Sequence, residues 1–188
     1  MNTLELKSGE IQSADTILRV VESILGREQG TPVVFVPAMG LTRKQLVEAG
    51  RKAAGQDMVV ATTLAEGLRT YHMQVARQLT SGGNWNGTRR RLGHIFQDVT
   101  DLLKGLHLLG DVSPRAELVA TFYAQSLAAT ILAHSLKERE REARALVGRN
   151  LAIDPDRSPL LAEVRGLLAE GTIPVLPHGL AKRISAGS

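Results

Sequence analysis

The pattern of apolar positions divides the chain into short strand-like segments and longer helical ones. Four short apolar segments predict strands, at Thr3–Leu6, Pro32–Val36, Ala145–Val147 and Ile173–Leu176. The second is a continuous apolar run, which is typical of a strand covered on both faces. This second strand is therefore expected inside the protein rather than at its surface.

Apolar residues three or four positions apart predict helices between these strands. The expected helices begin after Ser13, after Thr42 and at Ser113, and span Leu64–Leu79, Thr88–Leu109 and Leu160–Leu168. Gly30 is expected to close the first helix, Thr42 to cap the second, and Pro114 to occupy the first position of the helix after Ser113. Ser81–Gly87 is rich in glycine and polar residues, which predicts a flexible connection.

Strands that alternate with helices favour a parallel sheet, because each right-handed crossover places a helix on a face of the sheet. The two helices between about 62 and 110 predict a helical hairpin inserted into this framework. We therefore expect one domain over residues 1–180, built as a three-layer α/β/α sandwich with a mostly parallel sheet, and a frayed tail over 181–188.

Composition supports helices packed on a sheet, since apolar residues make up 43% of the 188 residues and aromatic residues only 3%. The chain has no cysteine, which excludes a disulfide or thiolate site. No apolar run approaches the roughly 20 residues that span a bilayer, and the N-terminus has no apolar signal core. A cytoplasmic protein with no membrane partner is expected.

The charge is mildly basic, with a formal net charge of +4 and its densest cluster at Arg89–Arg91. The cluster leaves open a phosphate- or nucleic-acid-binding module, although no set of stacking aromatic residues accompanies it. The five histidines are scattered, with no pair at ligand spacing, so no metal site is predicted. These are His72, His94, His107, His134 and His178.

Three short stretches carry the candidate chemistry. The first is Lys7-Ser8-Gly9-Glu10, after the first strand. The second runs from Val33 through Met39-Gly40-Leu41-Thr42 to Val47. The third is Leu109-Gly110-Asp111-Val112-Ser113-Pro114-Arg115, followed in the same helix by Phe122-Tyr123-Ala124-Gln125-Ser126.

Together these stretches resemble the N-terminal half of an aspartokinase of the amino-acid kinase family, over about residues 4–176. The resemblance implies that Lys7 and Gly9 are remnants of a loop that cradles nucleotide phosphates and neutralises charge during phosphoryl transfer. It also implies that Thr42 and Gln125 contact an amino-acid substrate such as aspartate. A plain surface turn at Lys7 and a helix N-cap at Thr42 explain the same residues through local chemistry alone.

The chain departs from the family pattern in two places. Glu10 replaces a glycine of the phosphate loop, and its carboxylate would repel phosphates. Gln125 replaces a glutamate that faces the substrate's amino group; a glutamine can still accept a hydrogen bond from an ammonium group, without the charge-assisted part. No counterpart of the nucleotide-binding half is recognised before Ser188.

These departures predict a degenerate, truncated aspartokinase-like domain without kinase activity of its own. It would bind an amino acid or a partner, either a second copy or an aspartokinase-like subunit. The alternatives are the aspartate-binding half of a split aspartate kinase and the phosphate or nucleic-acid module at Arg89–Arg91. No cofactor is expected, and ATP–Mg would bind only if a partner supplied the missing half.

Overall fold

The computed structural model describes residues 2–27, 30–148, 151, 158–181 and 184. Its four strands form one sheet in the order β1-β2-β4-β3, and every neighbouring pair is parallel. The strands are β1 (Thr3–Glu5), β2 (Val33–Val36), β3 (Ala143–Ala145) and β4 (Ile173–Pro177). The two central strands, β2 and β4, are buried along their whole length. The predicted α/β class with a parallel sheet is confirmed.

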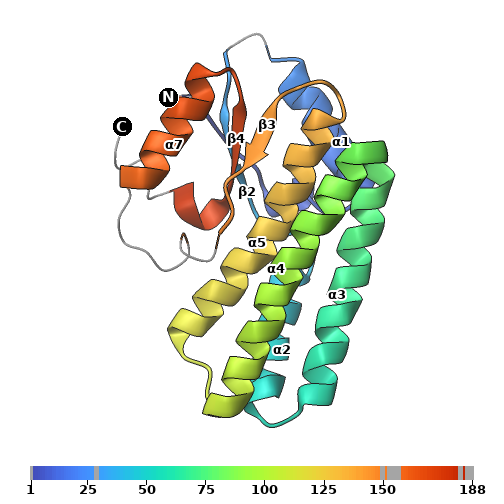
Figure 1. Cartoon of the computed structure of the whole chain (residues 1–188), viewed down its shortest axis with the longest axis vertical. Helices are drawn as coiled ribbons and strands as arrows, with labels where there is room; N and C mark the ends of the chain where they lie inside the picture. The colour runs from blue at the N-terminus through green and yellow to red at the C-terminus, as the bar shows by residue number, and fades with distance from the viewer. Residues whose placement is uncertain (1, 28–29, 149–150, 152–157, 182–183, 185–188) are drawn as a thin grey trace.

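Helices cover both faces of this sheet. Figure 1 shows α1 (Ala14–Leu25) and α5 (Pro114–Lys137) on one side and α7 (Ser158–Ala169) on the other. Right-handed crossovers require this arrangement, because the step from β3 back to β4 runs opposite to the steps from β1 to β2 and from β2 to β3. The sheet positions the carboxyl ends of β1, β2 and β4 along one edge.

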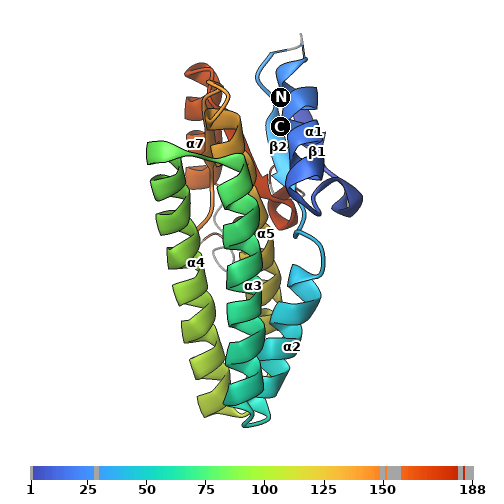
Figure 2. The same ribbon diagram turned by 90° about the vertical axis from the view of Figure 1, so that its right-hand side faces the viewer.

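Beyond that edge, three more helices pack with the N-terminal half of α5 as a bundle (Figures 1 and 2). They are α2 (Thr42–Ala54), α3 (Met58–Leu79) and α4 (Gly82–Leu109). A Cβ at Gly50 of α2 would lie 3.1 Å from Leu106 Cδ1 of α4, so a glycine is what lets these helices approach closely. The predicted hairpin is thus α3–α4, and it packs against both α2 and α5.

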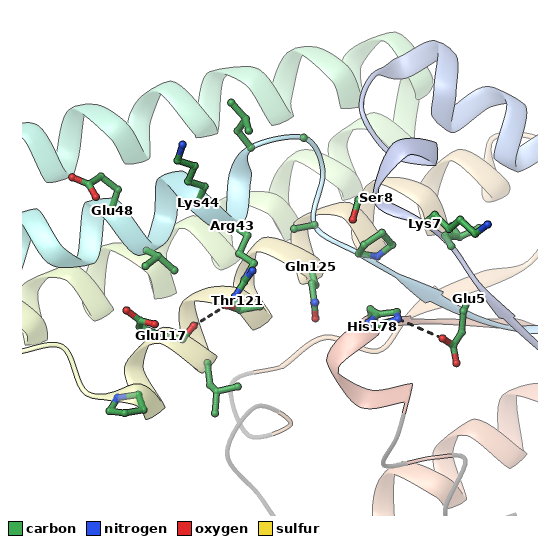
Figure 3. A pocket seen from close by; sticks show the side chains of 18 of the residues that line it. Glu5, Lys7, Ser8, Arg43, Lys44, Glu48, Glu117, Thr121, Gln125 and His178 are labelled. Atoms are coloured by element: carbon green, nitrogen blue, oxygen red, sulfur yellow. Dashed lines mark hydrogen bonds and ion pairs between the residues drawn. The ribbon is translucent and has the colours of Figure 1, made fainter.

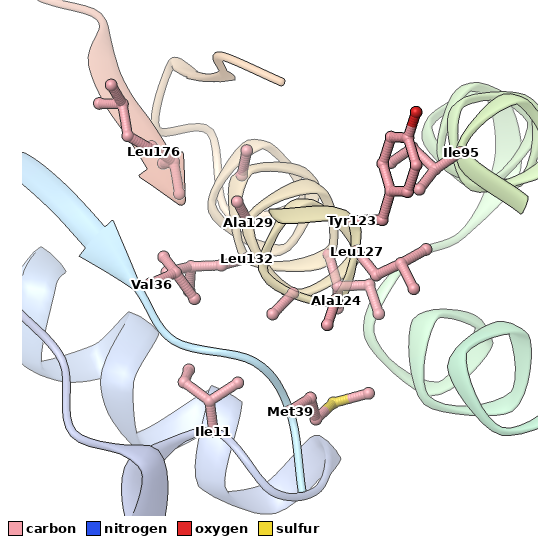
Figure 4. Close-up of a cluster of buried hydrophobic side chains, with 14 of the residues drawn as sticks. Ile11, Val36, Met39, Ile95, Tyr123, Ala124, Leu127, Ala129, Leu132 and Leu176 are labelled. Atoms are coloured by element: carbon pink, nitrogen blue, oxygen red, sulfur yellow. The ribbon is translucent and has the colours of Figure 1, made fainter. Parts of the chain in front are cut away.

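The long helix α5 joins the two parts and forms the centre of the core. In Figure 4 its Leu132 and Ala129 face Val36 and Leu176 of the strands, while Tyr123 faces Ile95 of α4. The helix is long and apolar enough to cross a membrane, but 72% of its apolar window is buried inside the protein. A helix that is apolar on all sides is buried in this way when it forms the core of a domain.

Several predicted boundaries are wrong. The first helix ends at Leu25 with Gly26 as its C-cap, rather than at Gly30, and β3 lies two residues before the predicted strand. Helix α3 begins six residues early, where the side chain of Asp57 accepts a hydrogen bond from the Val60 N–H. The tail predicted over 181–188 lies outside the described residues except for Ala181 and Ile184, which are buried.

The largest correction concerns Ser81–Gly87, which is helical from Gly82 onward instead of flexible. Tertiary contacts offset the low helix propensity of its glycines. Asn84 donates from Nδ2 to the His134 carbonyl oxygen at 2.9 Å and to Glu138 Oε2 at 2.7 Å. Hydrogen bonds from Ser81 and then Asn84 lower the pKa of Glu138. These contacts fix the start of α4 to the end of α5.

Candidate functional site

A cleft of about 1270 Å³ lies at the carboxyl edge of the sheet, between α2 and α5 (Figure 3). The loops that follow β1 and β2 and the short helix η2 (His178–Leu180) after β4 complete its rim. Ligands of open parallel sheets bind at this edge, because the loops there diverge around a crevice. The sequence-predicted residues Lys7 and Gln125 both line the cleft.

Two facing rows of side chains form the walls. The row on α2 is Arg43, Val47 and Arg51, and the row on α5 is Glu117, Thr121 and Gln125. Spacing by four residues places each row on one helix face. Arg43 Nε donates to Thr121 Oγ1 at 3.3 Å, and Arg51 forms an ion pair with Glu117 at 2.9 Å. Both arginines of the row on α2 are therefore bonded to polar side chains of the row on α5.

Gln125 lies at the inner end of the row on α5 and is buried, with 9% of its surface exposed. Its Oε1 accepts a hydrogen bond from the backbone N–H of Gly179, in η2, at 3.0 Å. This N–H determines the orientation of the amide, since the opposite flip would set two donors against each other. A Cβ at residue 179 would lie 3.2 Å from Oε1, so glycine permits the close approach of η2.

Positive charge in the cleft exceeds what its carboxylates neutralise. Glu117 pairs with Arg51, Glu48 lies 3.9 Å from Lys52 Nζ, and Glu5 lies 3.4 Å from His178 Nε2. Among the described residues, the ammonium groups of Lys7 and Lys44 and the terminal guanidinium nitrogens of Arg43 have no partner. The cleft therefore offers hydrogen-bond donors to an anion.

The loop at Lys7–Glu10, where the resemblance predicts a phosphate-loop remnant, is closed by the carboxylate of Glu10. The loop folds as a short 3-10 helix, η1 (Ser8–Glu10), and Glu10 Oε2 accepts the backbone N–H of Lys7 at 2.6 Å. Gly9 opens onto a separate cavity of about 280 Å³ beside α1, and Figure 3 shows the Lys7 side chain directed away from Gln125. A phosphate at this loop would meet the Glu10 carboxylate on the Lys7 N–H, so the loop does not present that N–H to an anion.

Thr42 lies in the interior rather than in the cleft. It is 1% exposed, and its hydroxyl donates to the Met39 carbonyl oxygen at 2.6 Å and lies 3.3 Å from His72 Nε2. The expected N-cap is wrong, because Leu41 occupies that position and Thr42 is the first residue of α2. Its role as a substrate contact stays a prediction.

His72 completes this buried polar pair. Burial lowers the pKa of His72 to about 4. Its Nδ1 lies 2.7 Å from the Leu68 carbonyl oxygen, so Nδ1 carries the proton of the neutral ring. Sequence reasoning set this histidine aside with the other four, because the partner that satisfies it is distant in the sequence.

Sequence reasoning also missed Arg43 and Thr121. The signal was available in the spacing of polar residues on α2 and α5, but nothing in the sequence shows that the two rows face each other. The arginine cluster has a structural contact, since Arg91 donates to the Val147 carbonyl oxygen at 3.1 Å, while Arg89 and Arg90 are exposed. Within the described ranges, no group of acidic or histidine side chains is arranged to hold a metal ion.

No protein-family description and no curated protein matches this chain. A solved structure does: E. coli aspartokinase III in complex with aspartate and ADP in its R-state, with a TM-score of 0.72. The match covers 94% of this chain at 14% identity, and the chain spans 40% of the length of that enzyme. At this identity the similarity shows the fold, and it confirms the aspartokinase-like fold that the motifs predicted.

Proposed function

We propose that this protein is a binding domain for a small carboxylic acid, built on an aspartokinase-like fold, and that it does not transfer phosphoryl groups on its own. We also propose a cytoplasmic location. The observation that carries it is the guanidinium of Arg43. Thr121 holds it at Nε, and its terminal nitrogens stay free in the cleft near Gln125 (Figure 3).

A planar guanidinium with two free nitrogens matches the two oxygens of a carboxylate. The aspartokinase III of similar fold was solved with aspartate, which makes aspartate the natural reference ligand for the cleft. The donors of Arg43 and Gln125 would bind carboxylate oxygens, and the ion pair between Arg51 and Glu117 would place a neutralised charge pair on the outer wall.

The contact between Glu10 and the Lys7 N–H supports the absence of nucleotide chemistry. A split aspartate kinase would need this loop to bind ATP–Mg together with another polypeptide. The loop would first have to release Glu10, and the charge-assisted hydrogen bond at 2.6 Å opposes that step.

The test is a calorimetric titration of the intact protein with aspartate and with simple dicarboxylic acids. Binding at millimolar or lower concentration that is lost in Arg43→Gln would support the proposal. A matched control is Arg69→Gln, on the exposed surface of α3 outside the cleft. Failure of every carboxylic acid to bind would overturn the proposal.

A second candidate is subunit interaction, favoured by exposed apolar residues at the far end of the bundle. Leu108, Leu109 and Val59 are 85%, 78% and 77% exposed, on ends of α4 and α3 that lie together in Figure 1. Large exposed apolar side chains that gather in one place often mark interfaces. Sedimentation should then show a homodimer that dissociates in Leu108→Ser but persists in Leu25→Ser, a control on the distant α1.

A further inference from the structure

The amide of Gln125 presents one kind of group to the cleft. Its oxygen faces η2, where it accepts the Gly179 N–H, and the glycine backbone crowds that side. Its nitrogen, Nε2, has no partner among the described residues and is left with two N–H donors. At this point of the cleft Gln125 is a donor and not an acceptor.

The polar side chains of α2 and α5 beside it offer no free acceptor either. Thr121 donates its hydroxyl hydrogen to the Glu117 carbonyl oxygen at 2.9 Å, while its oxygen accepts from Arg43 Nε. The carboxylate of Glu117 is engaged by Arg51. Glu48 lies on α2 away from Gln125 in Figure 3, and Glu5 is next to His178. An ammonium group between Gln125 and Arg43 would meet the amide donors and the positive charge of the guanidinium. On the loop after β1, the Ser8 hydroxyl would offer it a neutral acceptor and no negative charge.

We propose that this end of the cleft selects a dicarboxylate without an amino group over the corresponding amino acid, so that succinate binds more tightly than aspartate. This inference rests on the proposed function and sharpens it. A carboxylate accepts hydrogen bonds from the Arg43 guanidinium and the Gln125 N–H, whereas the α-ammonium of aspartate finds no free carboxylate there and is repelled by Arg43.

Titration of succinate and aspartate into the wild-type protein and Gln125→Glu provides the test. In the variant, one carboxylate oxygen keeps the Gly179 N–H and the other gives an ammonium group a charged acceptor. Wild type should prefer succinate by about tenfold or more, the size of one charge-assisted hydrogen bond. Gln125→Glu should reverse the preference, and Gln78→Glu, the same change on the exposed surface of α3, should not.

Gln125→Met covers the case in which Gln125→Glu fails to fold, as judged by its thermal midpoint. It removes the N–H donors without adding a charge, so succinate should weaken with no gain for aspartate. Wild-type protein that binds aspartate as tightly as succinate, or inorganic phosphate more tightly than either, would overturn the inference while leaving a ligand site in place. Failure of every anion to bind would overturn the proposed function as well.

Discussion

One face of helix α2 is buried in the core and the other faces the cleft, so two neighbouring residues on it lie in opposite environments. Thr42 turns inward, where its hydroxyl is satisfied by Met39 and lies beside His72, and its face buries Leu46, Ala49 and Ala53. Arg43, the next residue, faces the cleft with most of its donors free. The residue to which the resemblance assigns a substrate contact is in the core, and its neighbour, which the resemblance did not single out, lines the cleft.

A motif match therefore locates a helix more reliably than it assigns a role to each side chain. Interior polar groups must find partners within the protein, because burial without a hydrogen bond is costly. Groups in a cleft can be left unpaired, because water or a ligand satisfies them. Substitutions on the buried side are therefore expected to change stability, and substitutions on the cleft side are expected to change ligand affinity.

The largest effect is expected from His72, on the inner side. Its folded-state pKa of about 4 lies below the unfolded value of 6.5, so the unfolded chain binds a proton first as the pH falls. Folding stability is therefore unaffected by this histidine above pH 6.5. It falls by about 3 kcal/mol as the pH drops toward the folded pKa of about 4.

Urea unfolding of wild type and His72→Leu between pH 7 and pH 4 would measure this term. The unfolding free energy of wild type minus that of His72→Leu should fall by that amount between pH 7 and pH 4, because only wild type carries the titrating ring. His94→Leu, at an exposed histidine, is the control. If the unfolding free energy of wild type minus that of His72→Leu did not change with pH, the buried ring would be charged or solvated in the folded state.

Arg43→Gln is expected to weaken carboxylate binding about 10- to 100-fold, the equivalent of about 1.5–3 kcal/mol for a hydrogen bond to a charged group. The free energy of unfolding should be unchanged, because the Arg43 side chain is exposed and its one hydrogen bond among the described residues, to Thr121, is long. Calorimetry for affinity and urea unfolding for stability separate the two. A loss of stability with unchanged affinity would place Arg43 in the scaffold instead.

Thr42→Val should show the converse pattern. Valine keeps the shape and removes the hydroxyl, which costs about 1 kcal/mol of stability, while carboxylate affinity should hold within a factor of two. A large loss of affinity in this variant would restore Thr42 as a substrate contact, as the family resemblance implies.

The smallest effect concerns Arg51 and Glu117, whose side chains are 59% and 41% exposed. An exposed ion pair contributes about 0.2–1 kcal/mol, and less at high salt. Arg51→Gln should therefore lower the thermal midpoint slightly at low ionic strength and not at all in 1 M salt. A larger drop in the thermal midpoint that persists in 1 M salt would mean that Arg51 stabilises the protein through packing rather than through the exposed ion pair.

Elements held by local sequence were predictable, and those held by distant contacts were not. The continuous apolar run of β2 and the Ser-Pro start of α5 required no knowledge of the rest of the chain. The start of α4 was missed because Asn84 is fixed by His134 and Glu138, about 50 residues later. In the cleft, Lys7 and Gln125 were identified by resemblance, while Arg43 needed the facing row of α5.

The central claim is that this cleft binds carboxylate and not nucleotide, and paired titrations on one protein sample test it most directly. Succinate and ATP–Mg would be titrated separately into the wild-type chain and into Glu10→Gly, which frees the Lys7 N–H. The account predicts heat of binding for succinate in both proteins and none for ATP–Mg in wild type. Saturable ATP–Mg binding to the wild-type chain, with no response to succinate, would contradict it.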